Sequence, residues 1–535
     1  MSDPVSAPAS NAISNTASNP VLDAASGAIP DSASDTMSDS ASDAETGMTT
    51  QVSRGALWNG LAMLVQEGAV FLQAFLLPLW IRPEEYGLFA IAAAFTFLAG
   101  MLRDFSLGMK VVQDQTRSRE DAFGIALTLE LLLGAGGAIL IGIIGPIVGQ
   151  WKNDTELIWL IWMYMPFMFA GALALPEWTL LKDFRYRRRA IVLIAQQAAT
   201  SSVMFFTAIV LDWGVWALVI GMPINMIVMA TTLWPGKGYR AKLVWDPPAF
   251  KEYLRFGWPI WASSVCIAVF YLLSVNAIEI LFGLAFAGYF QRMWRVVELS
   301  YRLNMRAALA IYPAIVRFGT DIDRLRSSFQ VTNRLMMVLS APLAVVLGLF
   351  APDLVLFWRA EWADSAGLFQ AVGTFFIFGT LAFDWDLYYR AKGNTQPVFL
   401  VSAYLLFFLP LFLVFILVFD KLLDMQEFGI YVSVITTGLY MYAIRSYYAR
   451  KLLGNVSALK AAWKQIAAAL FAGTIGFALH ESLGSDKWSA IPGIFVMGLV
   501  YGGILLFTER KLFVFLLNAL RGRPTGGVNA LLASD

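Results

Sequence analysis

Apolar stretches of about 18–25 residues, separated by short polar breaks, recur between residues 55 and 508. A helix of this length crosses the roughly 30 Å hydrocarbon core of a bilayer. Because lipid offers no hydrogen bonds to the backbone, such segments fold as helices. The pattern therefore predicts an all-α polytopic membrane protein with about fourteen transmembrane helices. They lie at residues 55–79, 86–109, 122–148, 157–180, 190–211, 214–234, 257–281, 284–306, 331–351, 366–388, 397–419, 429–449, 465–481 and 489–508.

The composition excludes several other classes of protein. Hydrophobic residues make up 58% of the chain and charged residues 14%, against about 25% charged in soluble proteins. A single Cys and a single His rule out a disulfide framework and a Cys/His metal or catalytic pair. The sequence also has no G-x-x-x-x-G-K-[ST] loop for ATP hydrolysis. We expect no metal, no cofactor and no nucleic-acid partner.

Residues 1–50 form a segment of different character. They carry seven acidic side chains, no Lys or Arg, and no aromatic residue, with 11 Ser and 10 Ala. Such a segment cannot bury enough apolar surface to offset the entropy of ordering. It also lacks the basic start and apolar run of a secretory signal. We predict a disordered, acidic tail that stays in the cytoplasm.

The placement of Lys and Arg indicates the orientation. An even number of spans puts both termini on one side of the membrane. If that side is the cytoplasm, 30 of the 39 basic residues fall in inner stretches and 5 in outer ones, while 4 lie within 284–306. Inner loops of membrane proteins are rich in Lys and Arg. We therefore predict a multi-pass protein of the cytoplasmic (inner) membrane with both termini in the cytoplasm.

The stretch 284–306 carries arginines where charge is costly. At about 100° per residue, Arg292, Arg295, Arg302 and Arg306 fall within an arc of about 80°, with Glu298 at its edge. Four arginines facing lipid would cost roughly 10 kcal/mol. We therefore expect them to face a water-filled cavity, where guanidinium groups would bind a phosphate or an acidic sugar. In the alternative, Arg302 and Arg306 lie at the cytoplasmic edge and extend into water.

Several carboxylates also lie within predicted spans. A carboxylate inside a membrane can bind and release a proton, so each is a candidate for coupling transport to an ion. The candidates are Glu67, Glu130, Glu177, Glu279 and Glu298. Glu67 comes first because its span is unusually polar. The alternative for each is an ion pair with an arginine of the spans 284–306 or 86–109.

Two shorter patterns receive structural interpretations. Asp384-Trp385-Asp386 matches the D-x-D pattern of glycosyltransferase metal sites, but no catalytic domain accompanies it, so we expect no metal there. The basic segment 182–189 is typical of a topology determinant near anionic lipid. In the alternative, this segment gathers a pyrophosphate at the mouth of the cavity.

Two motifs carry a family resemblance. Residues 76–88, LLPLWIRPEEYGL, are similar to the turn that follows the first helix of polysaccharide flippases. Residues 103–108, RDFSLG, followed by Gln113, resemble the end of their second helix. Gly87-Leu88-Phe89 and Gly288-Tyr289-Phe290 also follow the starts of two spans at similar distances, which suggests an internal repeat. The chain resembles Wzx-type polysaccharide exporters of the multidrug/oligosaccharidyl-lipid/polysaccharide superfamily.

The resemblance implies two six-helix lobes around a basic central cavity, with two further helices outside. It also implies transfer of undecaprenyl-pyrophosphate-linked oligosaccharides from the inner to the outer leaflet, with Arg292, Arg295 and Arg302 matching the family's cavity arginines. We also count Arg103 among the candidate substrate-binding residues. Membrane lipid and a polysaccharide polymerase or export machinery would be partners. The expected parts are a tail at 1–50, an N-lobe at 51–235, a cytoplasmic linker at 236–256, a C-lobe at 257–450, two helices at 451–510 and a tail at 511–535.

Rival functions remain open at this point. A membrane polymerase, ligase or glycosyltransferase would need a large outer domain with acid and base residues, whereas the outer loops here are short. An exporter of the same fold could carry lipid II instead. It could also carry a cationic drug, although an arginine stripe would repel cations. We expect a flippase with no enzymatic activity.

Overall fold

The computed structural model describes most of the membrane-spanning part of the chain. The described residues are 58, 61–114, 116–183, 185–235, 241–319, 321–392, 396–419, 423, 425, 428–484 and 486–510; the side chains of 303, 306, 307, 309–314, 316, 317 and 398 are not described. The predicted tails at 1–50 and 511–535 lie outside these ranges. All described residues belong to one compact unit that begins at Gly55.

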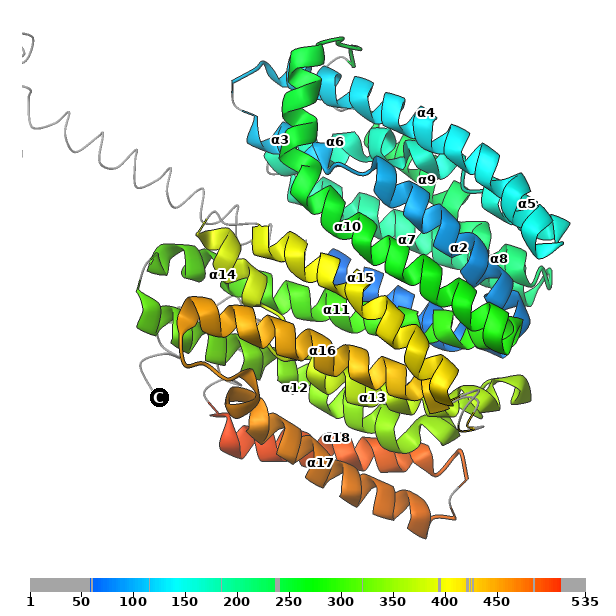
Figure 1. Ribbon diagram of the computed structural model, residues 1–535, viewed down its shortest axis with the longest axis vertical. Helices are drawn as coiled ribbons and strands as arrows, with labels where there is room; N and C mark the ends of the chain where they lie inside the picture. Colours follow the sequence, from blue (N-terminus) through cyan, green and yellow to red (C-terminus); the bar gives the residue numbers. More distant parts are fainter. Residues whose placement is uncertain are drawn as a thin grey trace, which may run out of the picture. The chain divides into compact units, whose positions relative to one another are not determined.

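Helices account for almost all of the described residues (Figure 1). The first part of the chain forms Leu61–Leu79, which ends in η1 (Leu77–Leu79), and then α2 (Pro83–Arg103), α3 (Leu107–Gln113), α4 (Arg119–Lys152), α5 (Thr155–Trp162), η2 (Pro166–Phe169), α6 (Ala170–Lys182), α7 (Tyr186–Ile209), α8 (Val215–Val219) and α9 (Gly221–Leu233). The second part forms α10 (Pro247–Phe282), α11 (Leu284–Phe318), α12 (Ile322–Val355), η3 (Ala360–Ser365), α13 (Ala366–Thr380), α14 (Trp385–Ala391), α15 (Gln396–Leu417), α16 (Phe428–Leu453), α17 (Ala458–Ser482) and α18 (Ala490–Thr508).

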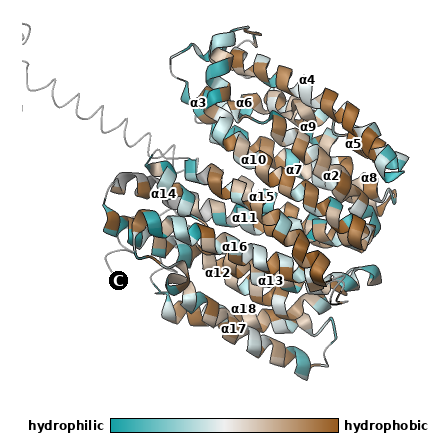
Figure 2. Cartoon of the chain, in the orientation of Figure 1, coloured by the Kyte–Doolittle hydropathy of each residue, from teal (hydrophilic) through white to brown (hydrophobic). Residues whose placement is uncertain are grey.

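Twelve segments among the described residues are long and apolar enough to cross a membrane. Each coincides with one of the fourteen predicted spans. The other two predicted spans correspond to α11 and α16, which have 35 and 26 residues; α11 carries several charged side chains, and α16 is rich in Tyr, Ser and Thr. Apolar residues cover most of each helix, and polar residues gather toward helix ends and connections (Figure 2). The predicted all-α membrane fold is confirmed, and the predicted count of fourteen is consistent with it.

The helix starts follow local sequence signals. Pro83 occupies the first turn of α2, where its missing N–H costs nothing, and the Glu85 side chain accepts a hydrogen bond from the Arg82 N–H at 2.8 Å. Asp246 caps α10 by accepting from the Ala249 N–H at 3.1 Å. Because α10 begins at Pro247, residues 247–256 of the expected linker are helical.

The helices pack in two groups (Figure 1). In the first group, α2 packs on α4, α5 and α8, and α6, α7 and α9 pack on one another. In the second group, α11 to α16 pack together, and α17 and α18 pack on each other and on α12. Helix α10 contacts α2 of the first group and α15 of the second, and α11 packs closely along α2. These two helices therefore join the groups.

One span of the second group is broken inside the membrane. Between α13 and α14 the chain leaves the helix at residues 381–384, and Ala382 has a φ of 57°. Asn333 of α12 supports the break by accepting from the Ala382 N–H at 2.8 Å. It also donates to the buried Asp384 carboxylate at 3.1 Å. Broken helices are tolerated at membrane depth where such partners satisfy the backbone.

Candidate functional site

A cavity of about 940 Å³ lies among α2, α10, α11 and α13–α16. This size falls in the range that accommodates a small-molecule ligand. Most of the lining is apolar or aromatic, from Phe97, Phe256, Phe270, Tyr271, Trp294, Tyr301, Phe375, Phe383 and Trp385. The charged lining residues are Arg295, Glu298, Arg302, Asp386, Arg390 and Arg445.

Two of the predicted arginines line this cavity from α11. Arg295 pairs with Glu298 at 3.0 Å, and Arg302 pairs with the same carboxylate at 2.8 Å. Spacings of three and four residues place the three side chains on one helix face. Arg302 also donates through Nε to Glu67 of the first membrane helix at 3.2 Å. Arg302 therefore links the first helix group to α11 at the cavity wall.

Arg292, the first arginine of the predicted stripe, lies outside the cavity lining. Its side chain is buried, with only 4% of the residue exposed. Its guanidinium stands 4.1 Å from the centre of the Tyr86 ring and donates to the Ala74 carbonyl oxygen at 3.1 Å. It therefore holds α11 against helix 61–79 and α2. The side chain of Arg306 lies outside the described residues.

The remaining sequence candidates form ion pairs away from the cavity. Arg103 pairs with Glu130 at 3.0 Å, and both side chains are buried. Gly171 makes room for this pair, because a Cβ there would lie 2.0 Å from Glu130 Oε2. Glu177 pairs with Arg189 at 2.8 Å. Glu130 thus has the ion pair with an arginine of the second span that was the alternative to coupling, whereas Glu177 pairs with an arginine of the basic segment 182–189.

Glu279 likewise forms an ion pair, with Lys152. Of the coupling candidates, Glu298 lines the cavity. Glu67 reaches the cavity wall through its bond to Arg302. These two acids are the ones that the fold brings to the arginines of α11.

The opposite wall of the cavity carries residues that sequence reasoning missed. Asp386 of α14 pairs with Arg390 at 2.9 Å. Arg445 of α16 donates to the Gly379 carbonyl oxygen at 2.5 Å and lies 5.2 Å from the centre of the Phe383 ring. The positive-inside count treated Arg390 and Arg445 as cytoplasmic loop charges. A signal was present for Arg445, which lies inside the predicted span 429–449.

The two aspartates of the D-x-D pattern have separate environments. Asp384 is buried and accepts hydrogen bonds from Asn333 at 3.1 Å and from the Tyr388 hydroxyl at 3.2 Å. Asp386 faces the cavity beside Arg390. Among the described residues, no group of three or more His, Cys, Asp or Glu side chains is arranged to hold a metal ion.

Several contacts of the second helix group lie near the start of α2 and the end of helix 61–79. Trp358 donates through its indole N–H to the Phe75 carbonyl oxygen at 2.7 Å. Trp362 is fully buried, and its ring packs at 5.3 Å from Tyr86 and 5.6 Å from Tyr289. Phe75, Tyr86, Tyr289, Arg292, Trp358 and Trp362 form a largely buried contact that we call the seal.

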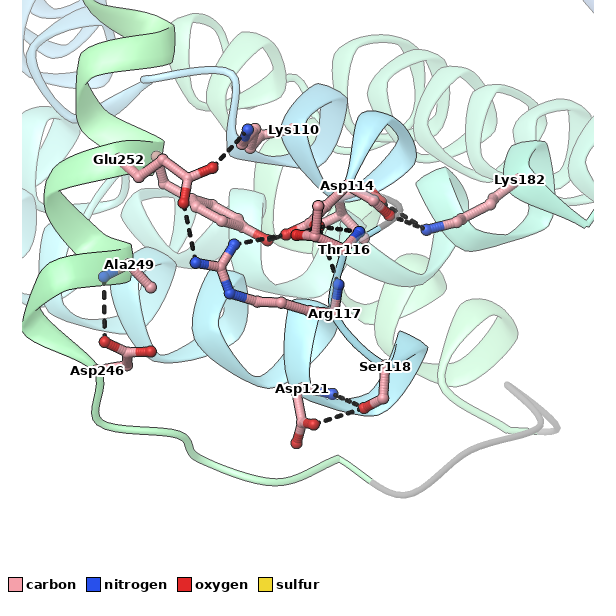
Figure 3. Close-up of polar contacts among 12 residues, drawn as sticks. Lys110, Asp114, Thr116, Arg117, Ser118, Asp121, Lys182, Asp246, Ala249 and Glu252 are labelled. Carbon is pink, nitrogen blue, oxygen red and sulfur yellow. Dashed lines mark hydrogen bonds and ion pairs between the residues drawn. The ribbon is translucent and has the colours of Figure 1, made fainter. Parts of the chain in front are cut away.

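A polar cluster joins α3 to α10 at the opposite end of α2 (Figure 3). Asp114 accepts from Arg117 at 2.9 Å and from the Tyr253 hydroxyl at 3.0 Å. Glu252 of α10 pairs with Lys110 at 2.8 Å and with Arg117 at 2.9 Å. We call these five residues the clamp. They hold the first turns of α10 against the first helix group.

The electrostatics of the clamp depend on its one buried carboxylate. Burial raises the pKa of Asp114, but hydrogen bonds from Arg117 and Thr116 outweigh it and hold the pKa well below the usual range. Lys182 of α6 reinforces the same turn by donating to the carbonyl oxygens of Val111 and Asp114 at 3.0 and 2.9 Å. Asp114 is therefore ionised at neutral pH and can accept the hydrogen bonds from Arg117 and Tyr253.

Comparison with known proteins assigns the chain to a family. Residues 79–366, more than half of its length, match the family described as "Polysaccharide biosynthesis protein". The chain belongs to this family. It is also 20% identical over 370 residues to the succinoglycan biosynthesis transport protein ExoT of Rhizobium meliloti (strain 1021), covering 65% of this chain and 74% of ExoT. The resemblance to Wzx-type exporters is thereby confirmed.

Solved structures show the same fold in two transporter classes. The lipid II flippase MurJ in an inward closed conformation aligns with a TM-score of 0.65 at 14% identity, covering 86% of this chain and 100% of MurJ. An inward-facing multidrug MATE transporter of the MOP superfamily aligns with a TM-score of 0.60 at 12% identity, covering 75% of this chain and 99% of that protein. This member of the polysaccharide biosynthesis family is therefore a multi-pass membrane protein with the fold of these transporters.

Proposed function

We propose that the protein is a flippase that moves a polyprenyl-pyrophosphate-linked oligosaccharide from the inner to the outer leaflet of the cytoplasmic membrane. One observation carries the proposal: Arg295, Arg302, Arg390 and Arg445 converge on a single cavity inside a bundle of membrane helices. Charged side chains at membrane depth are costly and mark substrate pathways.

The chemistry of the cavity suits the head group of such a substrate. A pyrophosphate diester carries two negative charges, and a guanidinium group binds phosphate oxygens through paired N–H donors. The low dielectric around the cavity strengthens these interactions relative to water. Aromatic side chains such as Tyr301 and Trp385 offer flat apolar surfaces for sugar rings. The polyprenyl chain stays in the surrounding lipid.

The contacts between the helix groups support a cytoplasm-facing cavity. Under the predicted orientation, both termini are cytoplasmic and the seal lies at the outer end of α2. Alternating access would open the seal and close the cytoplasmic end. A ligand can shift such an equilibrium only by binding the two states differently. The link from Arg302 to Glu67 supplies an element that changes when the two helix groups separate.

Ion coupling is part of the proposal. Glu67 is the first candidate to carry it, because a carboxylate released from Arg302 would be free to take up a proton or another cation. Delivery of the flipped oligosaccharide to a polysaccharide polymerase or export machinery would follow on the outer side.

The test is transport in cells that depend on this protein for surface polysaccharide. We expect the double variant Arg295→Ala, Arg302→Ala to reach the membrane in normal amounts and to abolish surface polysaccharide, because the cavity loses two guanidinium groups. Conversion of exposed Arg324 to Ala serves as the matched control. Wild-type polysaccharide from the double variant would contradict the proposed role of the cavity.

A further inference from the structure

The two charged walls of the cavity differ in how well their arginines are neutralised. On the α11 wall, Arg295 and Arg302 share Glu298, at 3.0 and 2.8 Å. Glu67 adds a second carboxylate to Arg302 at 3.2 Å. Among the described side chains of this wall, two guanidinium groups therefore contact two carboxylates, and their charges balance before a ligand arrives.

The wall formed by α14 and α16 carries an excess positive charge. Asp386 pairs with Arg390 at 2.9 Å. Arg445, within the part of the chain that the structure describes, has no carboxylate in ion-pair distance; it contacts the Gly379 carbonyl oxygen and the Phe383 ring, and it shares the longer-range attraction of Asp386 with Arg390. Two cations that share one carboxylate in a membrane cavity attract an anionic ligand more strongly than a neutralised pair does.

The bonding of Arg445 leaves donors for that ligand. A guanidinium group has five N–H donors, and Arg445 directs one of its two terminal nitrogens at Gly379. The carbonyl oxygen and the Phe383 ring fix its orientation at the cavity wall, so less conformational freedom is lost when an anion binds. Arg390, whose side chain is 41% exposed, lines the same wall.

The geometry points to an ordered capture of the substrate, an inference that rests on the proposed function. We propose that Arg445 makes the first contact with the anionic pyrophosphate head group. Arg302 becomes a ligand only after Glu67 releases it. The buried Arg302 Nη2, which has no hydrogen-bond partner among the described residues, is the donor that this second step would engage.

This order connects binding to movement. Glu67 lies on helix 61–79, which bonds to α7 of the first helix group through Gln73 and Ser201 at 2.8 Å, whereas Arg302 lies in the second group. Their bond therefore joins the two groups at the cavity wall. A pyrophosphate oxygen that takes the place of the Glu67 carboxylate would break that link while it satisfies Arg302. The substrate itself would then change a contact between the two groups at the cavity wall, which is separate from the seal.

The experiment measures binding of undecaprenyl pyrophosphate to the full-length protein in lipid nanodiscs by calorimetry. We expect Arg445→Gln to weaken binding about tenfold, the effect of losing charge-assisted hydrogen bonds. We expect Arg445→Lys, which keeps the charge, to restore most of the affinity and so to report on charge separately from folding. Arg324→Gln on the surface is the matched control, with an unchanged Kd.

Substitutions on the α11 wall should affect transport more than binding, in contrast to Arg445→Gln. We expect Arg302→Gln to change Kd less than Arg445→Gln does but to abolish transport. We expect Glu67→Gln to strengthen binding several-fold because it frees Arg302. That gain should vanish when Arg302→Gln is added.

The outcomes separate the two proposals. An unchanged Kd in Arg445→Gln, or a tenfold loss confined to Arg302→Gln, would overturn the ordered capture while leaving the flippase function standing. If the wild-type protein fails to bind undecaprenyl pyrophosphate at all, the proposed function falls, and the inference falls with it.

Discussion

Gly87 of α2 and Gly288 of α11 lie in direct backbone contact. A Cβ on Gly87 would stand 2.0 Å from the Leu284 carbonyl oxygen, and one on Gly288 would stand 2.0 Å from the Pro83 carbonyl oxygen. These glycines belong to the two similar Gly-x-Phe segments that suggested an internal repeat. Small residues let membrane helices approach this closely. The repeated glycines thus form the point where the two helix groups meet at the seal.

The first prediction concerns this glycine contact. Gly288→Ala should force α2 and α11 apart, since the added Cβ meets backbone and no flexible side chain can move aside. In a Cys266→Ala background, a cysteine at Phe75 should react several-fold faster with a membrane-impermeant maleimide added from outside. Gly136→Ala is the matched control, because a Cβ there meets nothing within 4 Å. Equal labelling in both variants would refute the close contact.

The second prediction separates Arg292 from the substrate ligands. Arg292→Gln removes the bond to Ala74 and the stacking on Tyr86, so it should reduce transport by weakening the seal. The Kd for undecaprenyl pyrophosphate, measured in nanodiscs, should stay within about twofold of wild type, because the cavity lining is intact. A loss of affinity as large as that of Arg445→Gln would instead make Arg292 a substrate ligand.

The third prediction concerns the clamp and acid stability. Asp114 has a pKa lowered by folding, so its ionised form stabilises the native state above the unfolded pKa of about 4, and this contribution is lost as the pH falls further. Asp114→Asn should lower the free energy of unfolding by about 1–3 kcal/mol at pH 7. The difference from wild type, followed by thermal unfolding in detergent, should shrink below about pH 4.

Asp323→Asn provides the matched control for this experiment. Asp323 also pairs with an arginine, Arg326, but its side chain is 90% exposed. Exposed pairs contribute about 0–1 kcal/mol. An acid profile of Asp114→Asn identical to that of Asp323→Asn would show that the clamp does not stabilise the fold.

The fourth prediction tests the buried pair of Arg103 and Glu130. Removing either partner leaves a buried charge unpaired, which typically costs about 3–5 kcal/mol. We therefore expect Arg103→Gln and Glu130→Gln each to lower the unfolding temperature strongly, and the double variant to lose less than the sum of the two. Strictly additive losses would mean that the two side chains do not interact. Retained ligand affinity in folded Arg103→Gln protein would place Arg103 outside the substrate site.

The spans themselves were predictable from the sequence. Hydropathy is a local property, so the predicted starts and ends generally agree with the helices to within a few residues. The larger differences are at helix ends that continue in polar sequence, such as α10, which begins at Pro247, and α11, which continues to Phe318. Hydropathy alone assigns a polar extension to a loop, although its backbone continues the helix.

The candidate site was predictable only in part. The helical period placed Arg295 and Arg302 on one face together with Glu298, and all three line the cavity. The same reasoning grouped Arg292 with them, although in the folded protein it turns to Tyr86 and Ala74. Arg445 was inside a predicted span, yet its position at the cavity depends on how α16 packs against the other helices.

The sequence by itself determined the membrane class, the helix positions, the family resemblance and the arginine face of α11, because each depends on composition or on neighbours within a few turns. Only the tertiary structure decided which charges meet. It paired Glu67 with Arg302, buried Arg103 against Glu130, and left Arg445 at the cavity wall with no carboxylate within reach among the described residues. Contacts between helices depend on the packing of residues far apart in the chain, and no local pattern encodes them.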